Sequence, residues 1–378
     1  MTGPLTVHLQ AADGATSTIT IPQPVIGYSQ PAVDSTHIAM AGTDLRTAVH
    51  GSSGSALLIP AGTFSLAGFS DPQGYVDGAR INKLSHGLSG AGPGKTIITP
   101  VVNSGTYVPP TSDTNNAFVI QDSKDGISNA PTIPVYEGFT VQGSAQSTTK
   151  FYNGFRVAFT TGAIIRYVSC VDAGPGNDHE PPGETFQMAT NQTVNTLIQN
   201  CTITASGGHG ASPIGGNNDT NLTWDTITCQ TTDGTAMASM PTCWQVNGLT
   251  IKNLVSRNGY AGLNLEDVSG AVLITNPVLY PDRTLFPYRY HFQINNQQSD
   301  NPNIVIKWDG VPTVGSGFPG VGQCVTVLIQ DQYGAGQKQT SMPKLYSGGQ
   351  LMTMVDYPTT GYTGPALDPT KFWFRGHQ

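Results

Sequence analysis

The amino-acid sequence predicts an all-β solenoid, in which short strands coil around one long axis. A pattern of alternating apolar residues recurs around Tyr167, Asn200, Thr226, Asn253 and Asn276, at steps of 33, 26, 27 and 23 residues. Periods of this length, carried by short alternating strands, are typical of solenoid proteins. Only 11% of the residues are charged and 45 are glycine, so helix-forming side chains are scarce and turns are frequent.

The composition also narrows the class of partner. The net charge is −7 and no basic run occurs, which argues against nucleic acid as the main partner. No apolar stretch approaches the roughly 20 residues of a membrane span, so no membrane insertion is expected, and the first residues lack the basic-then-apolar layout of a signal peptide. Of the five cysteines, Cys170, Cys201 and Cys229 fall on inward-facing positions, and we expect them to be reduced apolar filler of the core.

Residues 1–43 are expected to lie outside the repeat, as an N-terminal arm or attachment segment. Two β-like patches, Leu5–Leu9 and Thr18–Ile21, precede a proline-containing extended stretch, and a docking arm, a linker and a partner-swapped strand all remain open. Residues Asp44–His50 predict a short helix, because their apolar side chains share one face. A solenoid must cover the apolar end of its first coil, and this helix is placed to do so.

Two strand pairs follow the helix, ALLIPAGTFSL at residues 56–66 and GLSGAGPGKTII at residues 87–98. A helix followed by IPAGTF and then by this glycine-rich pair resembles the opening of the pectate-lyase-like right-handed parallel β-helix superfamily. That superfamily includes phage tailspikes, polygalacturonases and related polysaccharide-acting proteins. The similarity covers residues 44–295 and implies three strands per coil, with the asparagine positions of the repeat at the turn between the second and third strands.

The resemblance assigns the first strands of successive coils to residues 154–159, 184–189, 210–215, 262–267 and 291–295. Successive side chains of a strand point to opposite faces, so apolar residues such as Phe155 and Phe186 are expected to point inward. The residues expected to bind substrate on the outward side and in its bordering loops are Arg156, Gln187, Arg257, Tyr260, Asn264 and Glu266.

We expect the parallel β-helix to span residues 44–310. Beyond Asn296 the pattern loosens into separate strands, so residues 311–378 are expected to form a β-rich C-terminal cap or oligomerisation region. By analogy with tailspike-like relatives, this region implies a homotrimer.

The densest group of ionisable residues lies in one loop between a third and a first strand. Residues 172–184 hold the candidate catalytic residues Asp178, His179, Glu180 and Glu184, and the corresponding loop of the next coil holds His209. Adjacent coils lie about 4.8 Å apart, so the two loops are expected to meet. Paired carboxylates suit glycosidic hydrolysis, whereas a base with a charge-neutralising partner suits a lyase or an epimerase. Solvated loop charges and a turn-forming histidine are the alternatives.

Two short segments carry a local resemblance. Gly208-His209-Gly210 is similar to the Gly-His-Gly segment of polygalacturonases, with Asp178 matching that family's acid, but the family's paired-aspartate and Arg-x-Lys segments have no counterpart here. The segment from Asp178 to Glu180 resembles the Asp-Pro-His-Glu segment of alginate epimerases without its proline. No cofactor is expected. Many relatives use calcium, but no aspartate cluster in this sequence has a suitable ligand spacing for it.

The leading hypothesis is a phage tail protein of the tailspike kind, made in the host cytoplasm without a signal peptide and carried in the virion tail. Such a protein binds a bacterial surface polysaccharide, and in one version depolymerises it, while contacting other virion tail proteins. A free-standing polysaccharide hydrolase or lyase, and a non-catalytic structural virion or adhesin protein, are the alternatives.

Overall fold

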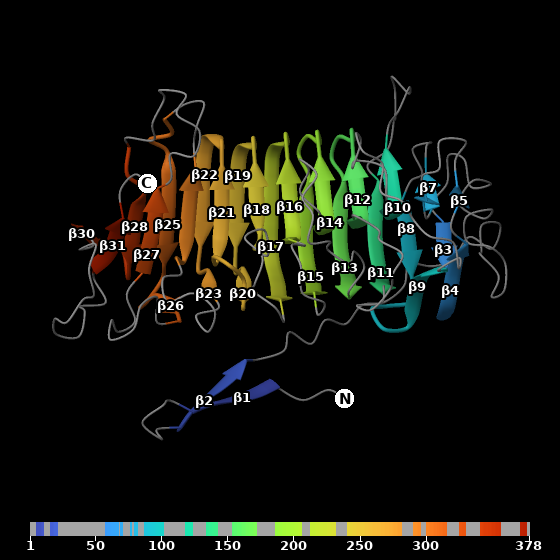
Figure 1. The fold of residues 1–378 in the computed structure, drawn as a ribbon, viewed down its shortest axis with the longest axis horizontal. Coiled ribbons are helices and arrows are strands. Elements are labelled where there is room, and N and C mark those ends of the chain that lie inside the picture. The colour runs from blue at the N-terminus through green and yellow to red at the C-terminus, as the bar shows by residue number, and fades with distance from the viewer. Residues whose placement is uncertain are drawn as a thin grey trace.

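The chain forms a right-handed parallel β-helix whose coils lie side by side along one long axis (Figure 1). The computed structural model describes residues 5–10, 16–21, 57–67, 69–70, 76–77, 79–81, 87–101, 118–123, 134–142, 153–171, 186–205, 212–231, 240–281, 290–295, 300–315, 325–329, 341–356 and 371–375. The predicted fold class is therefore confirmed, whereas the helix expected at residues 44–50 lies outside the described residues.

The first strands of the coils form one eleven-stranded sheet, here called the first-strand sheet. In spatial order its strands are β7 (Ala79–Ile81), β10 (Phe118–Ser123), β12 (Asn153–Ala158), β14 (Phe186–Asn191), β16 (Ser212–Asn217), β18 (Thr242–Trp244), β21 (Leu263–Glu266), β24 (Phe292–Asn295), β27 (Val325–Ile329), β31 (Lys371–Arg375) and β30 (Thr353–Asp356). The five first strands expected from the sequence are all present, and the sheet adds β18 between β16 and β21, at residues for which no strand was expected.

The second and third strands share a sixteen-stranded sheet. Its main path runs through β3 (Leu57–Ile59), β8 (Gly87–Gly90), β11 (Val135–Gln142), β13 (Ile164–Val171), β15 (Leu197–Ala205), β17 (Thr220–Thr231), β19 (Asn247–Lys252), β22 (Ser269–Thr275), β25 (Ile304–Trp308), β28 (Lys344–Ser347) and β29 (Gln350–Leu351). The separate third strands are β4 (Gly62–Ala67), β9 (Thr96–Val101), β20 (Val255–Arg257), β23 (Val278–Tyr280) and β26 (Thr313–Val314).

A single residue in the left-handed conformation makes the turn between the second and third strands. The five repeat positions identified in the sequence all have this conformation, with φ of 53° at Tyr167, 53° at Asn200, 57° at Thr226, 53° at Asn253 and 50° at Asn276. Asparagine tolerates positive φ better than most residues, because its short polar side chain can bond locally. The repeat in the sequence therefore marks a backbone requirement that returns once per coil.

The core is a stack of apolar side chains in register from coil to coil. Ile165, Ile198, Trp224, Ile251 and Ile274 are successive partners on parallel strands, and each is fully buried. Cys170, Cys201, Cys229 and Cys243 are free thiols in the same core, as expected for the first three. Burial raises the pKa of the Cys201 thiol to about 12, so this cysteine is held in its unreactive protonated form.

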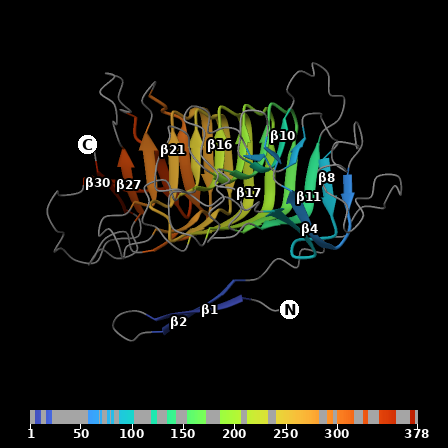
Figure 2. The ribbon, with the colours of Figure 1, turned by 45° about the vertical axis from the view of Figure 1, so that its right-hand side comes forward.

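Antiparallel pairs occur only away from the main coils within the described residues. One is the hairpin of β1 (Leu5–Gln10) and β2 (Thr16–Ile21), and another is the small pair β5 (Phe69–Ser70) and β6 (Val76–Asp77). At the other end, β29 folds back antiparallel on β28. Figure 2 shows the two main sheets passing around the same core from one end of the solenoid to the other.

Candidate functional site

The outward-pointing side chains of the first-strand sheet, here called the outer face, are aligned by the strand register into columns. The middle column consists of Arg156, Ala189, Gly215, Thr242, Asn264 and Gln293. The column at the ends of the strands, here called the end column, consists of Ala158, Asn191, Asn217, Trp244, Glu266 and Asn295. Each column presents one side chain about every 4.8 Å, the spacing of neighbouring strands.

Three of the expected substrate-binding residues lie on this face but are not open to solvent. The exposed fraction is 6% for Arg156, 1% for Gln187 and 3% for Asn264. Arg156 and Asn264 share the middle column, but Ala189, Gly215 and Thr242 separate them, so about 19 Å divides their strands. The structure therefore places these residues on one face without bringing all of them into one site.

The expectation that Phe186 points inward is wrong. Phe186 is buried but is not part of the core cluster, and its ring lies over Gly215 of the next coil, on the outward side of that residue. A Cβ atom on Gly215 would lie 2.2 Å from the ring. Only a glycine at position 215 leaves this space open. The Phe186 ring fills it and therefore departs from the alternating pattern of its strand.

Arg257 and Tyr260 belong to another part of the coil. Arg257 is the last residue of the third strand β20, and its guanidinium carbon lies 4.7 Å from the centroid of the Tyr280 ring on the neighbouring coil. Tyr260 lies in the connection from β20 to β21 and is half-buried. The structure therefore assigns Arg257 a cation–π contact between coils, away from the column that holds Glu266.

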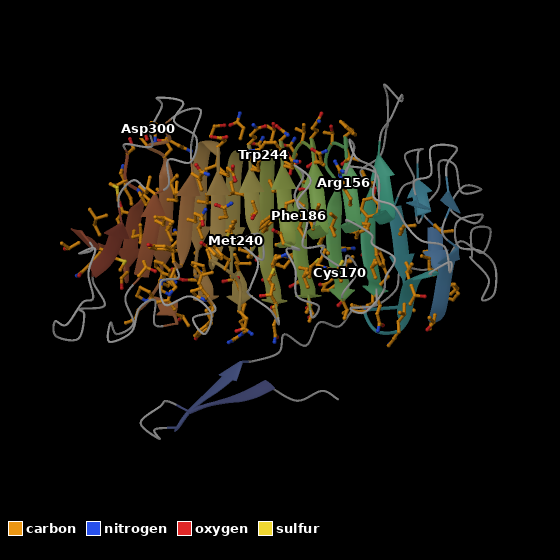
Figure 3. The ribbon with its side chains drawn as sticks, in the orientation of Figure 1. Arg156, Cys170, Phe186, Met240, Trp244 and Asp300 are labelled. Atoms are coloured by element: carbon orange, nitrogen blue, oxygen red, sulfur yellow. The ribbon has the colours of Figure 1, made fainter. Side chains whose placement is uncertain are left out.

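Trp244, Asn264 and Glu266 lie next to one another on the outer face, and of the three only Asn264 is buried. Trp244 and Glu266 are register partners on β18 and β21, and both are half-buried. The Asn264 side-chain amide donates a long hydrogen bond of 3.5 Å to a carboxylate oxygen of Glu266. Figure 3 shows Trp244 near the upper edge of the solenoid, well above Met240 of the same coil.

The surroundings of Glu266 shift its pKa upward. Burial raises the pKa of this carboxyl above its ordinary value, the hydrogen bond from Asn264 opposes that rise, and the charge of Asp267 adds to it. The Asn264 oxygen Oδ1 is itself buried and accepts no hydrogen bond from the described part of the chain. The group therefore presents a carboxylate and a spare amide oxygen beside an indole ring.

The sequence did not point to Trp244 or to Asn191. Trp244 ends a strand of only three residues, which is too short to show alternation. The apolar residue Cys243 beside it, which points into the core, is the one feature of the sequence that could have indicated an outward Trp244. Asn191 lies two coils before Trp244 in the end column, and its side-chain oxygen is also buried without a hydrogen-bond partner among the described residues. The five candidate catalytic residues, namely Asp178, His179, Glu180, Glu184 and His209, lie outside the described residues.

The described residues lack both a metal-binding group and a membrane-spanning helix. They contain no group of three or more histidine, cysteine, aspartate or glutamate residues arranged to hold a metal ion. They also contain no helix with the length and apolar character needed to cross a bilayer.

No protein-family model matches the chain, and no curated protein matches it. Among solved structures, it is similar to the A-module of the Azotobacter vinelandii mannuronan C-5 epimerase AlgE4, with 13% identity, a TM-score of 0.44, and coverage of 89% of this chain and 91% of that one. The catalytic domain of a GH87 alpha-1,3-glucanase in complex with nigerose is similar over 95% of this chain and 67% of its own, with 10% identity and a TM-score of 0.39. ORF18 of Geobacillus virus E2 gives 10% identity and a TM-score of 0.38, over 80% of this chain and 57% of its own. At such scores, the function has to be argued from the residues of this chain.

Proposed function

We propose that this protein is a tailspike-like phage tail component that binds a bacterial cell-surface polysaccharide along its outer face. The observation that supports this most is the middle of the end column, where Asn217, Trp244 and Glu266 of three successive coils are half-buried, so that an amide, an indole and a carboxylate reach the surface of the sheet. A linear glycan offers hydroxyl groups and flat apolar ring faces at regular intervals. Amide and carboxylate oxygens suit the hydroxyls, and the apolar body of an indole suits the ring faces.

Binding is tested with a panel of purified bacterial envelope polysaccharides, using the intact protein and its Trp244→Ala variant. We expect at least one polysaccharide to bind, with an affinity reduced roughly tenfold or more by the substitution, because a central aromatic anchor is removed. If no polysaccharide binds, the proposed function is contradicted and the alternative of a purely structural virion protein is favoured. Sedimentation of the same samples tests the proposed homotrimer.

A depolymerising version of this function places the chemistry in the loops at residues 172–184 and 206–210. Asp178 or Glu184 would protonate the leaving oxygen of the glycosidic bond or activate the attacking group, and His209 would act as a base. Glycan cleavage requires these roles. We expect Asp178→Ala, Glu184→Ala and His209→Ala each to slow chain shortening about a hundredfold or more while glycan binding persists. Full activity in all three variants would exclude these loops as the catalytic site.

The product distinguishes a hydrolase from a lyase. New reducing ends without ultraviolet absorbance indicate hydrolysis, whereas an unsaturated, absorbing product indicates elimination. If the protein binds the glycan but does not shorten it, the protein is an adhesin and not a depolymerising enzyme. These outcomes apply equally to a free-standing enzyme, and detection of the protein in purified virions identifies the tail component.

A further inference from the structure

The side chains next to Trp244 include hydrogen-bond acceptors that lack a donor among the described residues. Glu266 contributes a carboxylate, and Asn264 contributes a buried oxygen with no partner among the described residues. An ionised carboxylate only accepts hydrogen bonds, so the NH₂ group of Asn264 must face it, at 3.5 Å, and the Asn264 oxygen must point elsewhere. Asn191, 8% exposed, adds another acceptor without a partner two coils away in the end column.

A buried acceptor without a partner is unfavourable by roughly 1–3 kcal/mol. Native proteins retain few of them, and those that remain often await a ligand or an ordered water. At this position, two acceptors lie beside each other on one strand, and the indole of Trp244 leaves the neighbouring strand on the same side. A ligand suited to these acceptors carries several N–H or O–H donors and, preferably, a positive charge.

A protonated amine fits the exposed part of this group. Its N–H donors suit the Glu266 carboxylate, and its charge compensates that half-buried carboxylate. The face of an indole is the most favourable aromatic surface for a cation. Register pairing holds Trp244 and Glu266 on strands about 4.8 Å apart, which leaves the ammonium in reach of both.

We infer that Trp244 and Glu266 form a subsite for the protonated amino group of an amino sugar, in which Asn264 positions the Glu266 carboxylate. This inference rests on the proposed binding of a glycan along the outer face and specifies the sugar that is read there. The polysaccharide accordingly contains hexosamine units whose amine is free rather than acetylated.

The direct test compares three oligosaccharides of equal length with the same β-1,4 linkage, built of glucosamine, N-acetylglucosamine or glucose. We expect isothermal titration calorimetry to show the glucosamine oligomer binding to the full-length protein about tenfold or more tightly than the other two, since charge-assisted hydrogen bonds are the stronger kind. The amine requires an ionised Glu266. Its affinity should therefore rise with pH through the titration of that carboxyl and fall again where the amine loses its proton.

Two substitutions separate the roles of the side chains. Glu266→Gln keeps the shape and removes the charge, so it should erase the preference for glucosamine, lowering the affinity of the glucosamine oligomer far more than that of the glucose oligomer. Trp244→Leu should weaken the glucosamine oligomer a further two- to fivefold relative to the glucose oligomer. Asp267→Asn is the matched control, because it removes an equal charge at the next residue, whose φ of 49° asparagine accepts readily.

The outcomes distinguish this inference from the function on which it rests. Equal binding of all three oligomers to the unsubstituted protein, or no effect of Glu266→Gln on the preference, overturns the amine subsite but leaves glycan binding in place. An equal effect of Asp267→Asn shows that general charge is responsible and also overturns the subsite. Failure of all three oligomers, together with binding to an envelope polysaccharide that lacks amines, overturns the subsite alone. Failure with every glycan overturns the proposed function too.

Discussion

Asp219 shows how a single residue connects successive coils. Its carboxylate is almost fully buried and accepts hydrogen bonds from the Thr190 hydroxyl at 2.6 Å, from the Thr193 amide at 2.7 Å and hydroxyl at 2.8 Å, and from the Asn217 amide at 3.0 Å. Burial nevertheless raises the pKa of Asp219 from 3.8 to about 6, against the lowering effect of these bonds. The folded protein therefore binds a proton here more readily than the unfolded chain does.

The sign of the pH dependence follows from that difference. Between pH 3.8 and about 6 the folded state holds more protons at Asp219 than the unfolded state, so its contribution to stability falls as the pH rises. We expect the free energy of unfolding, relative to that of Asp219→Asn, to decrease by up to about 3 kcal/mol from pH 4 to pH 7. Denaturant titrations at several pH values measure this difference. A difference that stays constant with pH contradicts the raised pKa.

At the scale of the strand and its turn, the left-handed position between the second and third strands favours asparagine, and Tyr167 and Thr226 depart from that preference. A β-branched residue at positive φ is strained, and Thr226 has φ of 57° between coils that use Asn200 and Asn253 at the same place. Its hydroxyl donates a hydrogen bond to Asp225 at 3.0 Å, on a half-buried surface, which offsets only part of that strain.

Exchanging asparagine and threonine tests this preference in both directions. We expect Thr226→Asn to increase the free energy of unfolding by about 1 kcal/mol and Asn253→Thr to decrease it by a similar amount. Chemical denaturation measures both, and each variant is the control for the other. Destabilisation by both substitutions would mean that local contacts outweigh the backbone conformation.

At the scale of the whole molecule, each coil is stabilised by its two neighbours. The central strands β13, β15 and β17 each pair along their length on both sides, whereas β29 is the last strand of its sheet and pairs only with β28. In such a quasi-one-dimensional structure, local opening is easiest at the ends.

Hydrogen exchange should therefore vary along the solenoid. We expect the amides of β13, β15 and β17 to exchange slowest and those of β28 and β29 at least tenfold faster, because end coils open without disturbing the centre. Hydrogen–deuterium exchange with peptide-level mass spectrometry measures this profile. Equal protection of the central coils and the last strands would indicate that the solenoid unfolds only as one unit.

The sequence by itself determined where the coils turn and which side chains fill them. Tyr167, Asn200 and Asn253 were aligned from spacing alone, because positive φ restricts which residues fit and a solenoid repeats that restriction once per coil. The strands on which Arg156, Asn264 and Glu266 lie were assigned from the resemblance to β-helix proteins, and alternation then indicated their outward side.

Only the tertiary structure decided which of these residues meet. The Phe186 ring left the core because the next coil has Gly215, and the sequence of β14 alone contains no sign of that space. Trp244 and Glu266 lie on different coils and became neighbours through strand register, since a strand of three residues such as β18 has no pattern of its own. Local preferences determine the coil, whereas side chains from separate coils share a site only after the backbone hydrogen bonds have set the register.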